Sequence, residues 1–258
     1  MSFIISTQVE LLKIKRTSSL WLSIAGAAFI PLMLFISFFA GDDASKVALL
    51  KDPWTKYLSM GWELFNVLLL PMYIILICTL ITQIEYRNNG WKQVFASPQS
   101  FGNIFFSKFL TIHVIIIFSF LLFNFFVILA AILANVINQK FTFLSSRINW
   151  QMLLQLNLKT YIATLGITAV QYWVSLRFKN FIAPLGIGVA LVIVAIVAMA
   201  AQSAHIYKYP YSFPILTYDF MQKKNRPFLE NHELNSIGYF IFFVLLGFLD
   251  MRLRKERG

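Results

Sequence analysis

The chain has 258 residues, of which 59% are hydrophobic and only 13% are charged, whereas soluble domains carry about 25% charged residues. Its net charge of +11 comes largely from Lys and Arg between apolar runs, as in membrane proteins whose spans are flanked by basic residues. This composition excludes a cytosolic enzyme, a disordered chain and a protein with a nucleic-acid partner, and it predicts an integral membrane protein in contact with a lipid bilayer.

The first segment, residues 1–19, is predicted to form an amphipathic helix at the membrane surface. Ser6, Glu10, Lys13 and Thr17 share one helical face, and apolar side chains cover most of the rest. A wide apolar face beside a narrow polar one is typical of a helix that lies in the membrane interface. The alternative is an ordinary basic leader.

Six stretches meet or approach the length of about 20 apolar residues that a helix needs to cross a bilayer core. The fourth stretch is the most polar of them, and the last is the shortest. The sequence therefore predicts an all-α, polytopic membrane protein with a single transmembrane domain over residues 1–258. The predicted spans cover residues 20–40, 61–84, 109–134, 152–176, 181–203 and 234–251.

Six spans place both termini on one side of the membrane, and the charge balance between the two sides predicts which side that is. The side that holds the termini carries 12 basic residues against 4 acidic ones. The opposite side carries 9 basic residues against 7 acidic ones, including Glu63. Because basic residues accumulate in cytoplasmic loops, both termini are expected in the cytoplasm.

A cytoplasmic segment, residues 85–108, follows the second predicted span. Trp91, Val94 and Phe95 fall at helical spacing and form a short apolar face. This pattern predicts a short amphipathic helix on the cytoplasmic side. Its apolar face either anchors the segment in the membrane interface or contacts a protein partner.

The fourth predicted span carries a polar stripe, because polar residues recur on it every three or four positions. Such a stripe does not face lipid. It lines either a water-filled translocation path or a contact with another helix, and packing is the favoured interpretation. Lys159 in this span is expected to extend to the interface, and contact with an anionic substrate is the less favoured alternative. The residues assigned to the candidate path are Thr160, Thr164, Thr168, Gln171 and Ser175.

The fifth predicted span and the loop after it carry two further patterns. Gly186 and Ala190 form a pair of small residues at helical spacing, which permits close contact between helices. The outer segment, residues 204–233, is long for a connector and rich in aromatic residues and proline. It is expected to form an aromatic belt at the interface or a partly re-entrant element.

Several kinds of catalytic and binding motif are missing from the sequence. It contains no Gly-x-x-x-x-Gly-Lys-[Ser/Thr] phosphate loop, no His-Glu-x-x-His pair and no cysteine cluster that would bind a metal. The chain is therefore expected to bind no metal or other cofactor itself. If it performs active transport, the energy is expected to come from a partner.

The layout resembles that of the membrane-spanning permease subunits of type-2 ABC transporters, most of which are exporters. The specific part of the resemblance lies at Glu85-x-Arg87-Asn88-Asn89-Gly90-Trp91-Lys92, Ser97-Pro98-Gln99-Ser100 and Lys108, which are similar to the coupling-helix region of that family. Many members carry Gly-Thr where this chain has Gly90-Trp91. The Asn-rich form is closer to small permeases of lantibiotic or bacitracin self-protection.

The resemblance implies a dimer with a second permease copy or a homologous permease, and two separate ABC ATPase subunits that bind ATP and Mg²⁺. The chain itself would then catalyse no reaction. An outer gate is implied near Tyr209, Tyr211, Phe213 and Tyr218. The residues implied to contact the ATPase in the coupling segment are Glu85, Arg87, Trp91, Lys92, Val94 and Phe95.

Three other functions remain open from the sequence. An ATPase-coupled complex could extract a membrane-bound molecule, sense it or transmit force without net transport. An intramembrane enzyme would need an acid, a base or a nucleophile at membrane depth, and the few ionisable residues there argue against it. A self-contained channel or secondary transporter is disfavoured by the absence of an internal repeat.

Overall fold

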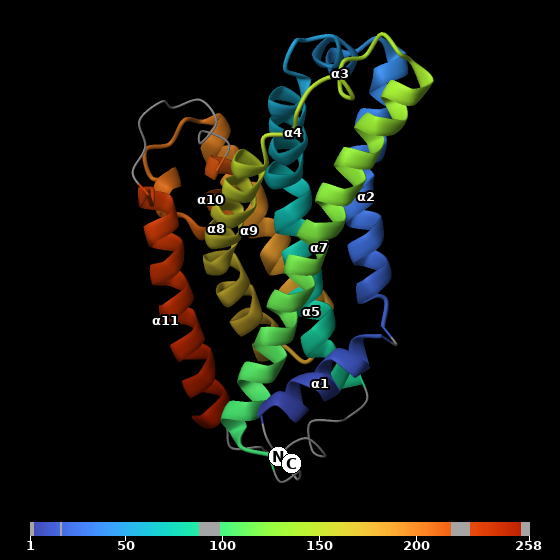
Figure 1. The fold of residues 1–258 in the computed structure, drawn as a ribbon. Helices are drawn as coiled ribbons and strands as arrows, with labels where there is room; N and C mark the ends of the chain where they lie inside the picture. Colours follow the sequence, from blue (N-terminus) through green and yellow to red (C-terminus); the bar gives the residue numbers. More distant parts are fainter. Residues whose placement is uncertain (1–2, 16, 88–98, 218–227, 254–258) are drawn as a thin grey trace.

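The computed structural model describes residues 3–15, 17–87, 99–217 and 228–253. The described residues form helices and connecting turns, without a strand. Figure 1 shows long helices side by side, with α1 oblique to them at one end of the bundle and α3 at the other. These two ends are called the α1 end and the α3 end below.

Long helices cover each stretch for which the sequence predicts a span, and shorter ones lie at the bundle ends and in the outer segment. Among the described residues, five helical runs are long and apolar enough to cross a membrane: Ser19–Ala40, Pro53–Tyr86, Phe101–Ile137, Ile182–Ala200 and Asn231–Leu253. The chain is thus an all-α, polytopic membrane protein. The helices are α1 (Phe3–Ile14), α2 (Ser19–Ala40), α3 (Asp43–Ala48), α4 (Pro53–Leu64), α5 (Leu70–Arg87), α7 (Phe101–Ile137), α8 (Trp150–Arg177), α9 (Ile182–Ala200), α10 (Phe213–Leu216) and α11 (Asn231–Leu253).

Helix α8 differs from these five runs because many of its side chains are polar, although it is 28 residues long. It packs against α11 along much of its length and also contacts α5. Its polar residues Thr160, Thr168 and Gln171 are fully buried, so the polarity that lowers its hydropathy is turned toward protein. A helix this polar is compatible with membrane depth because its polar side chains contact other helices instead of lipid.

Helices α4 and α5 form one continuous run that is interrupted by a π-helical turn, η1 (Phe65–Leu69). Pro71 lies two residues after the end of this turn. A proline has no amide hydrogen and clashes with the carbonyl four residues earlier, so the regular α-helical pattern cannot continue through it. Local π-helical bonding is one way in which a helix accommodates such a break.

An aromatic cluster closes the α3 end. Phe38 of α2 lies against Tyr57 of α4, with ring centroids 5.4 Å apart, and against Phe141 and Phe143 in the connection from α7 to α8. The indole of Trp54 donates a hydrogen bond to the Phe143 carbonyl at 2.9 Å. These contacts fix how α2, α4 and α7 meet at this end, while the α1 end is held by charges.

Candidate functional site

Helix α1 turns its narrow polar face toward the bundle. Ser6 and Glu10 are buried, whereas Ile4 and Leu12 on the opposite face are exposed. The Ser6 hydroxyl donates to Gln99 Oε1 at 3.3 Å, next to the N-terminus of α7. The amphipathic pattern of residues 1–19 therefore has its polar side on protein and its apolar side outward.

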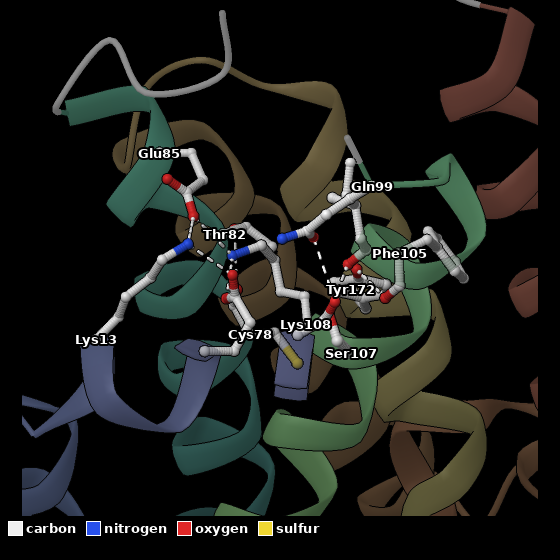
Figure 2. Close-up of polar contacts among 12 residues, drawn as sticks. Lys13, Cys78, Thr82, Glu85, Gln99, Phe105, Ser107, Lys108 and Tyr172 are labelled. Carbon is white, nitrogen blue, oxygen red and sulfur yellow. Dashed lines mark hydrogen bonds and ion pairs between the residues drawn. The ribbon is translucent and has the colours of Figure 1, made fainter. Parts of the chain in front are cut away.

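Four charged side chains meet where α1, α5 and α7 converge, and they form the charge cluster: Glu10 and Lys13 of α1, Glu85 of α5 and Lys108 of α7. Lys108 Nζ lies 2.6 Å from Glu10 Oε2 and 3.2 Å from Glu85 Oε1. Lys13 Nζ lies 2.7 Å from Glu10 Oε1 and 2.7 Å from Glu85 Oε1. Figure 2 shows Lys13 and Lys108 both pointing toward Glu85.

The charge cluster is neutral as a whole and largely shielded from solvent. The side chain of Lys108 is 1% exposed and that of Glu85 6% exposed, while Lys13 lies at the rim at 29%. Buried charges persist when they are paired and hydrogen-bonded, and removing one partner costs about 3–5 kcal/mol. The geometry is therefore that of a stiff joint between three helices.

The surroundings of Lys13 favour its charged form. Partial burial lowers the pKa of Lys13, but the carboxylates of Glu10 and Glu85 outweigh this effect, so the pKa is raised above its ordinary value. A lysine with a raised pKa contributes stability that is fully present below the unfolded-state pKa of about 10.4 and is lost as the pH rises through the folded-state pKa. The contribution of Lys13 is thus expected to stay constant across the physiological pH range.

The position of the cluster relates it to the predicted coupling segment. Glu85 lies two residues before the end of α5, and Lys108 lies in the second turn of α7, so the cluster binds both arms of the segment to α1. Glu85 is the one predicted coupling residue whose side chain is described. Arg87 ends α5, and its side chain lies outside the described residues, as do the residues Trp91, Lys92, Val94 and Phe95.

The end of α5 is tied to the turn between α8 and α9 as well. Tyr86 Oη donates to the Leu176 carbonyl at 2.9 Å. Gln83 Nε2 donates to the carbonyls of Phe178 and Asn180, at 2.9 and 3.1 Å. Movement at the start of the coupling segment would therefore reach α8 and α9 in addition to α1 and α7.

The polar stripe of α8 is buried inside the bundle. Thr160 faces Asn66, whose Nδ2 lies 3.4 Å from the threonine hydroxyl, and the Ser175 hydroxyl lies 3.4 Å from that of Thr79 on α5. Thr164 and Thr168 donate to carbonyls of their own helix. All five stripe residues, Thr160, Thr164, Thr168, Gln171 and Ser175, are at most 1% exposed. In this conformation the stripe is a helix contact, which Thr160 and Ser175 make with the continuous run of α4, η1 and α5.

The outer segment reaches the same stripe. Its described part up to residue 217 contains two 3₁₀ turns, η2 (Ile206–Lys208) and η3 (Pro210–Ser212), followed by α10. Tyr211 Oη donates to Gln171 Oε1 at 2.9 Å, and Tyr209 Oη donates to the Leu191 carbonyl of α9 at 2.9 Å. Phe213 is fully buried, and Tyr218 lies outside the described residues. Three of the four predicted gate residues are thus packed between or beside α8 and α9.

Gln171 connects three elements. Its Oε1 accepts from Tyr211, and its Nε2 donates to the Pro184 carbonyl of α9 at 2.9 Å. Gln171 lies six residues before the end of α8 at Arg177, a distance of about 9 Å along the helix. The tip of Tyr211 therefore lies deep in the bundle, far from the α3 end.

Replacing Gln171 with Leu is expected to lower stability by about 2 kcal/mol, because the buried Tyr211 hydroxyl and the Pro184 carbonyl both lose a partner. The melting temperature of the purified protein should fall by roughly 4–8 °C. Gln155→Leu, at an exposed position of the same helix, is the control and should leave the melting temperature within about 1 °C. Equal melting of the two variants would show that the Gln171 bonds are not formed.

The surroundings of Lys159 and of the Gly186–Ala190 pair are more specific than the sequence predicts. Lys159 pairs with Glu233 in the first turn of α11, with Nζ 3.0 Å from Oε2. Gly186 and Ala190 are exposed, and the close contact of α9 within the chain is made by Gly188 instead. Within the described part of the chain, no group of three or more His, Cys, Asp or Glu side chains is placed to hold a metal ion.

Comparison with known protein families matches residues 6–195 to the family described as "ABC-2 family transporter protein". The matched range covers about three quarters of the chain and includes all four residues of the charge cluster. No curated protein and no solved structure matches the chain.

Proposed function

Because the chain belongs to the ABC-2 transporter family and is a membrane permease of that kind, we propose that it is the membrane-spanning subunit of an ATP-driven exporter. Two permeases, either two copies or this chain with a homologous one, work with separate ABC ATPase subunits. ATP and Mg²⁺ bind to those subunits, and the permease chain catalyses no reaction itself. The closer resemblance to permeases of lantibiotic or bacitracin self-protection stays a prediction.

The observation that carries this proposal is the charge cluster. The segment that the resemblance assigns to ATPase contact is held at both of its arms, through Glu85 and Lys108, to one transverse helix. To transmit movement from a soluble ATPase subunit into the helix bundle, the coupling segment must be rigidly attached to the helices. Buried, multiply bonded charges supply stiffness because any displacement exposes an unpaired charge.

The mechanism follows from the contacts around the cluster. Closure of the ATPase subunits displaces residues 85–108, and the cluster transfers the displacement to α1, α5 and α7. Through Tyr86 and Gln83 the same movement reaches the turn between α8 and α9. Since the polar stripe faces α5, a shift of α5 against α8 would open it and convert the helix contact into a path.

The membrane arrangement completes the proposal. Helix α8 is the fourth of six spans, both termini are cytoplasmic, and the protein lies in the bacterial cell membrane. The exposed apolar face of α1 rests in the cytoplasmic interface, because Ile4 and Leu12 point away from the bundle. The outer segment is re-entrant, and Tyr209, Tyr211 and Phe213 belong to the outer gate, which the Tyr211–Gln171 bond supports.

A second candidate function is favoured by the complete burial of the stripe. An ATPase-coupled complex could pull a molecule out of the membrane, or transmit force, while the path between α5 and α8 stays closed. Release of a bound molecule without net movement across sealed vesicles would support this function over export.

Purification of the tagged chain in mild detergent is expected to bring down a stoichiometric soluble subunit with ATPase activity. In that complex, Arg87→Glu combined with Trp91→Ala should reduce permease-dependent stimulation of ATP hydrolysis by about tenfold or more, because the coupling segment loses its charge and its largest apolar side chain. Lys179→Glu, an exposed charge reversal between α8 and α9, is the control and should leave stimulation unchanged. A chain that purifies without any ATPase after gentle crosslinking would contradict the proposal.

A further inference from the structure

The π-helical turn between α4 and α5 leaves one backbone carbonyl without its ordinary helical donors. The Leu70 amide donates to the Phe65 carbonyl, five residues earlier. The Asn66 carbonyl would ordinarily accept from position 70 in an α-helix or from position 71 in a π-helix. Residue 71 is proline, which has no amide hydrogen, so neither ordinary helical donor serves this carbonyl.

The side chain of Asn66 has an uncommitted oxygen as well. The residue is 2% exposed, and its Nδ2 makes one long hydrogen bond to Thr160, at 3.4 Å. Among the residues that the structure describes, no donor lies within hydrogen-bond distance of Oδ1. Leaving a buried acceptor without a hydrogen bond costs about 1–3 kcal/mol, and Asn66 Oδ1 is such an acceptor.

The surroundings of Asn66 combine irregular backbone with polar and aromatic side chains. Thr160 belongs to the polar stripe of α8, and α10 of the outer segment packs against η1. On the neighbouring side, Phe65 stacks on Phe123 of α7 with centroids 4.2 Å apart. Broken helices and short re-entrant pieces at membrane depth are where transporters place their substrate contacts, because irregular backbone exposes hydrogen-bonding groups.

We propose that Asn66 is a substrate-binding residue at the centre of the translocation path, where its two oxygens accept hydrogen bonds from an N–H or O–H group of a neutral or cationic substrate. The inference deepens the proposed function and rests on it. When α5 moves against α8, the Asn66–Thr160 contact opens and both residues face the path. The aromatic side chains beside them receive the apolar part of the same substrate.

The charge class follows from the chemistry of the site. Uncommitted oxygens favour hydrogen-bond donors and disfavour anions, which present only acceptors. The nearest polar residue across the contact, Thr160, carries no charge. An ammonium or amide group suits this site, and a carboxylate or phosphate group does not.

Cysteine accessibility tests the position without a known substrate. Cys78 is the single cysteine of the chain and is buried, so Cys78→Ala provides the background. In the complex with its ATPase, Asn66→Cys is labelled with a methanethiosulfonate reagent carrying trimethylammonium, either without nucleotide or with ATP and vanadate. The trapped state should be labelled about tenfold faster or more, because the contact with α8 opens. Ile74→Cys, equally buried on α5, is the control and should react slowly in both states.

A second reporter keeps Asn66 in place and measures the charge class. Thr160→Cys in the trapped state is labelled with the trimethylammonium reagent and with its sulfonate counterpart, each rate being divided by that for free cysteine. The normalised labelling rate of the cationic reagent should exceed that of the anionic reagent by about fivefold or more. Adding Asn66→Leu should remove most of this lead. A faster anionic reagent, or a lead that Asn66→Leu leaves intact, would overturn the assignment of donor-bearing substrates to Asn66.

The outcomes separate this inference from the proposed function. A complex without ATP hydrolysis would contradict the proposed function. A complex that hydrolyses ATP in the Cys78→Ala background, yet leaves Asn66→Cys as slow as Ile74→Cys in both states, would show that Asn66 is a packing residue and would overturn the inference alone.

Discussion

Lys108→Met is expected to destabilise the protein by about 3–5 kcal/mol, which corresponds to a fall in melting temperature of roughly 10 °C or more. The substitution keeps a side chain of similar length but removes the ammonium that lies 2.6 Å from Glu10 and 3.2 Å from Glu85. Two carboxylates that are at most 10% exposed would then share Lys13 alone. Thermal melting of the purified variant, monitored as the loss of monodisperse protein on heating, measures the effect.

Two companion variants give this result its meaning. Lys46→Met removes an exposed ion pair with Asp43 at the α3 end, and it should shift the melting temperature by about 2 °C or less. Glu10→Gln combined with Lys108→Met removes one charge of each sign and retains the Lys13–Glu85 pair. This double variant should recover at least half of the melting temperature that Lys108→Met alone loses. If Lys108→Met melted like Lys46→Met, the cluster would not be a buried joint.

The same double variant tests the role of the joint in coupling. Because it is neutral and folded, any defect that remains concerns the transfer of movement rather than stability. We expect the ATPase complex to assemble with it while permease-dependent stimulation of hydrolysis falls. Normal stimulation would show that α1 is attached to the coupling segment for stability alone.

The helical fold follows from local sequence, whereas the charge cluster does not. Each apolar run of about 20 residues has few structures available to it in a bilayer other than a helix, so composition and length are sufficient. The cluster joins Glu10 to Lys108, which are 98 positions apart. The one local signal was that Lys108 is the sole lysine or arginine in the 37-residue helix α7, and its partners depend on how three helices meet.

Lys159 shows that a local rule does not identify the tertiary partner of a residue. A lysine near the end of a span ordinarily extends to the interface. Here Glu233 begins the facing helix α11 and is 1% exposed, so it requires a cation, and Lys159 supplies it at 3.0 Å. The partner lies 74 positions away, and hydropathy contains no information about that pairing.

The polar stripe lies between these two cases. Periodicity predicts which α8 residues share a face, and all five of them are buried together. Periodicity does not identify the facing helix, so Asn66 and Thr79 on the α4–α5 run were not among the predicted site residues. Asn66 carries a detectable signal only in hindsight, because it is a polar residue five positions before a proline inside an apolar run.

Gly188→Leu is expected to destabilise the protein by about 3 kcal/mol or more, because α9 approaches α5 and α8 most closely at this residue. A Cβ atom at position 188 would lie 2.7 Å from Ile75 Cγ2 and 2.8 Å from Gln171 Oε1. The added side chain must therefore push α9 away from α5 and disturb the Gln171 bonds to Pro184 and Tyr211. Thermal melting measures the loss of stability.

Gly186→Leu is the matched control, two residues away on the same helix. A Cβ atom at position 186 meets nothing within 4 Å, so the leucine projects outward and replaces a poor helix former with a good one. We expect its stability to be unchanged or raised by up to about 1 kcal/mol. Equal destabilisation of both variants would instead place Gly186 in a tight contact with a second permease copy, and would move the small-residue contact of α9 from the inside of the chain to the dimer interface.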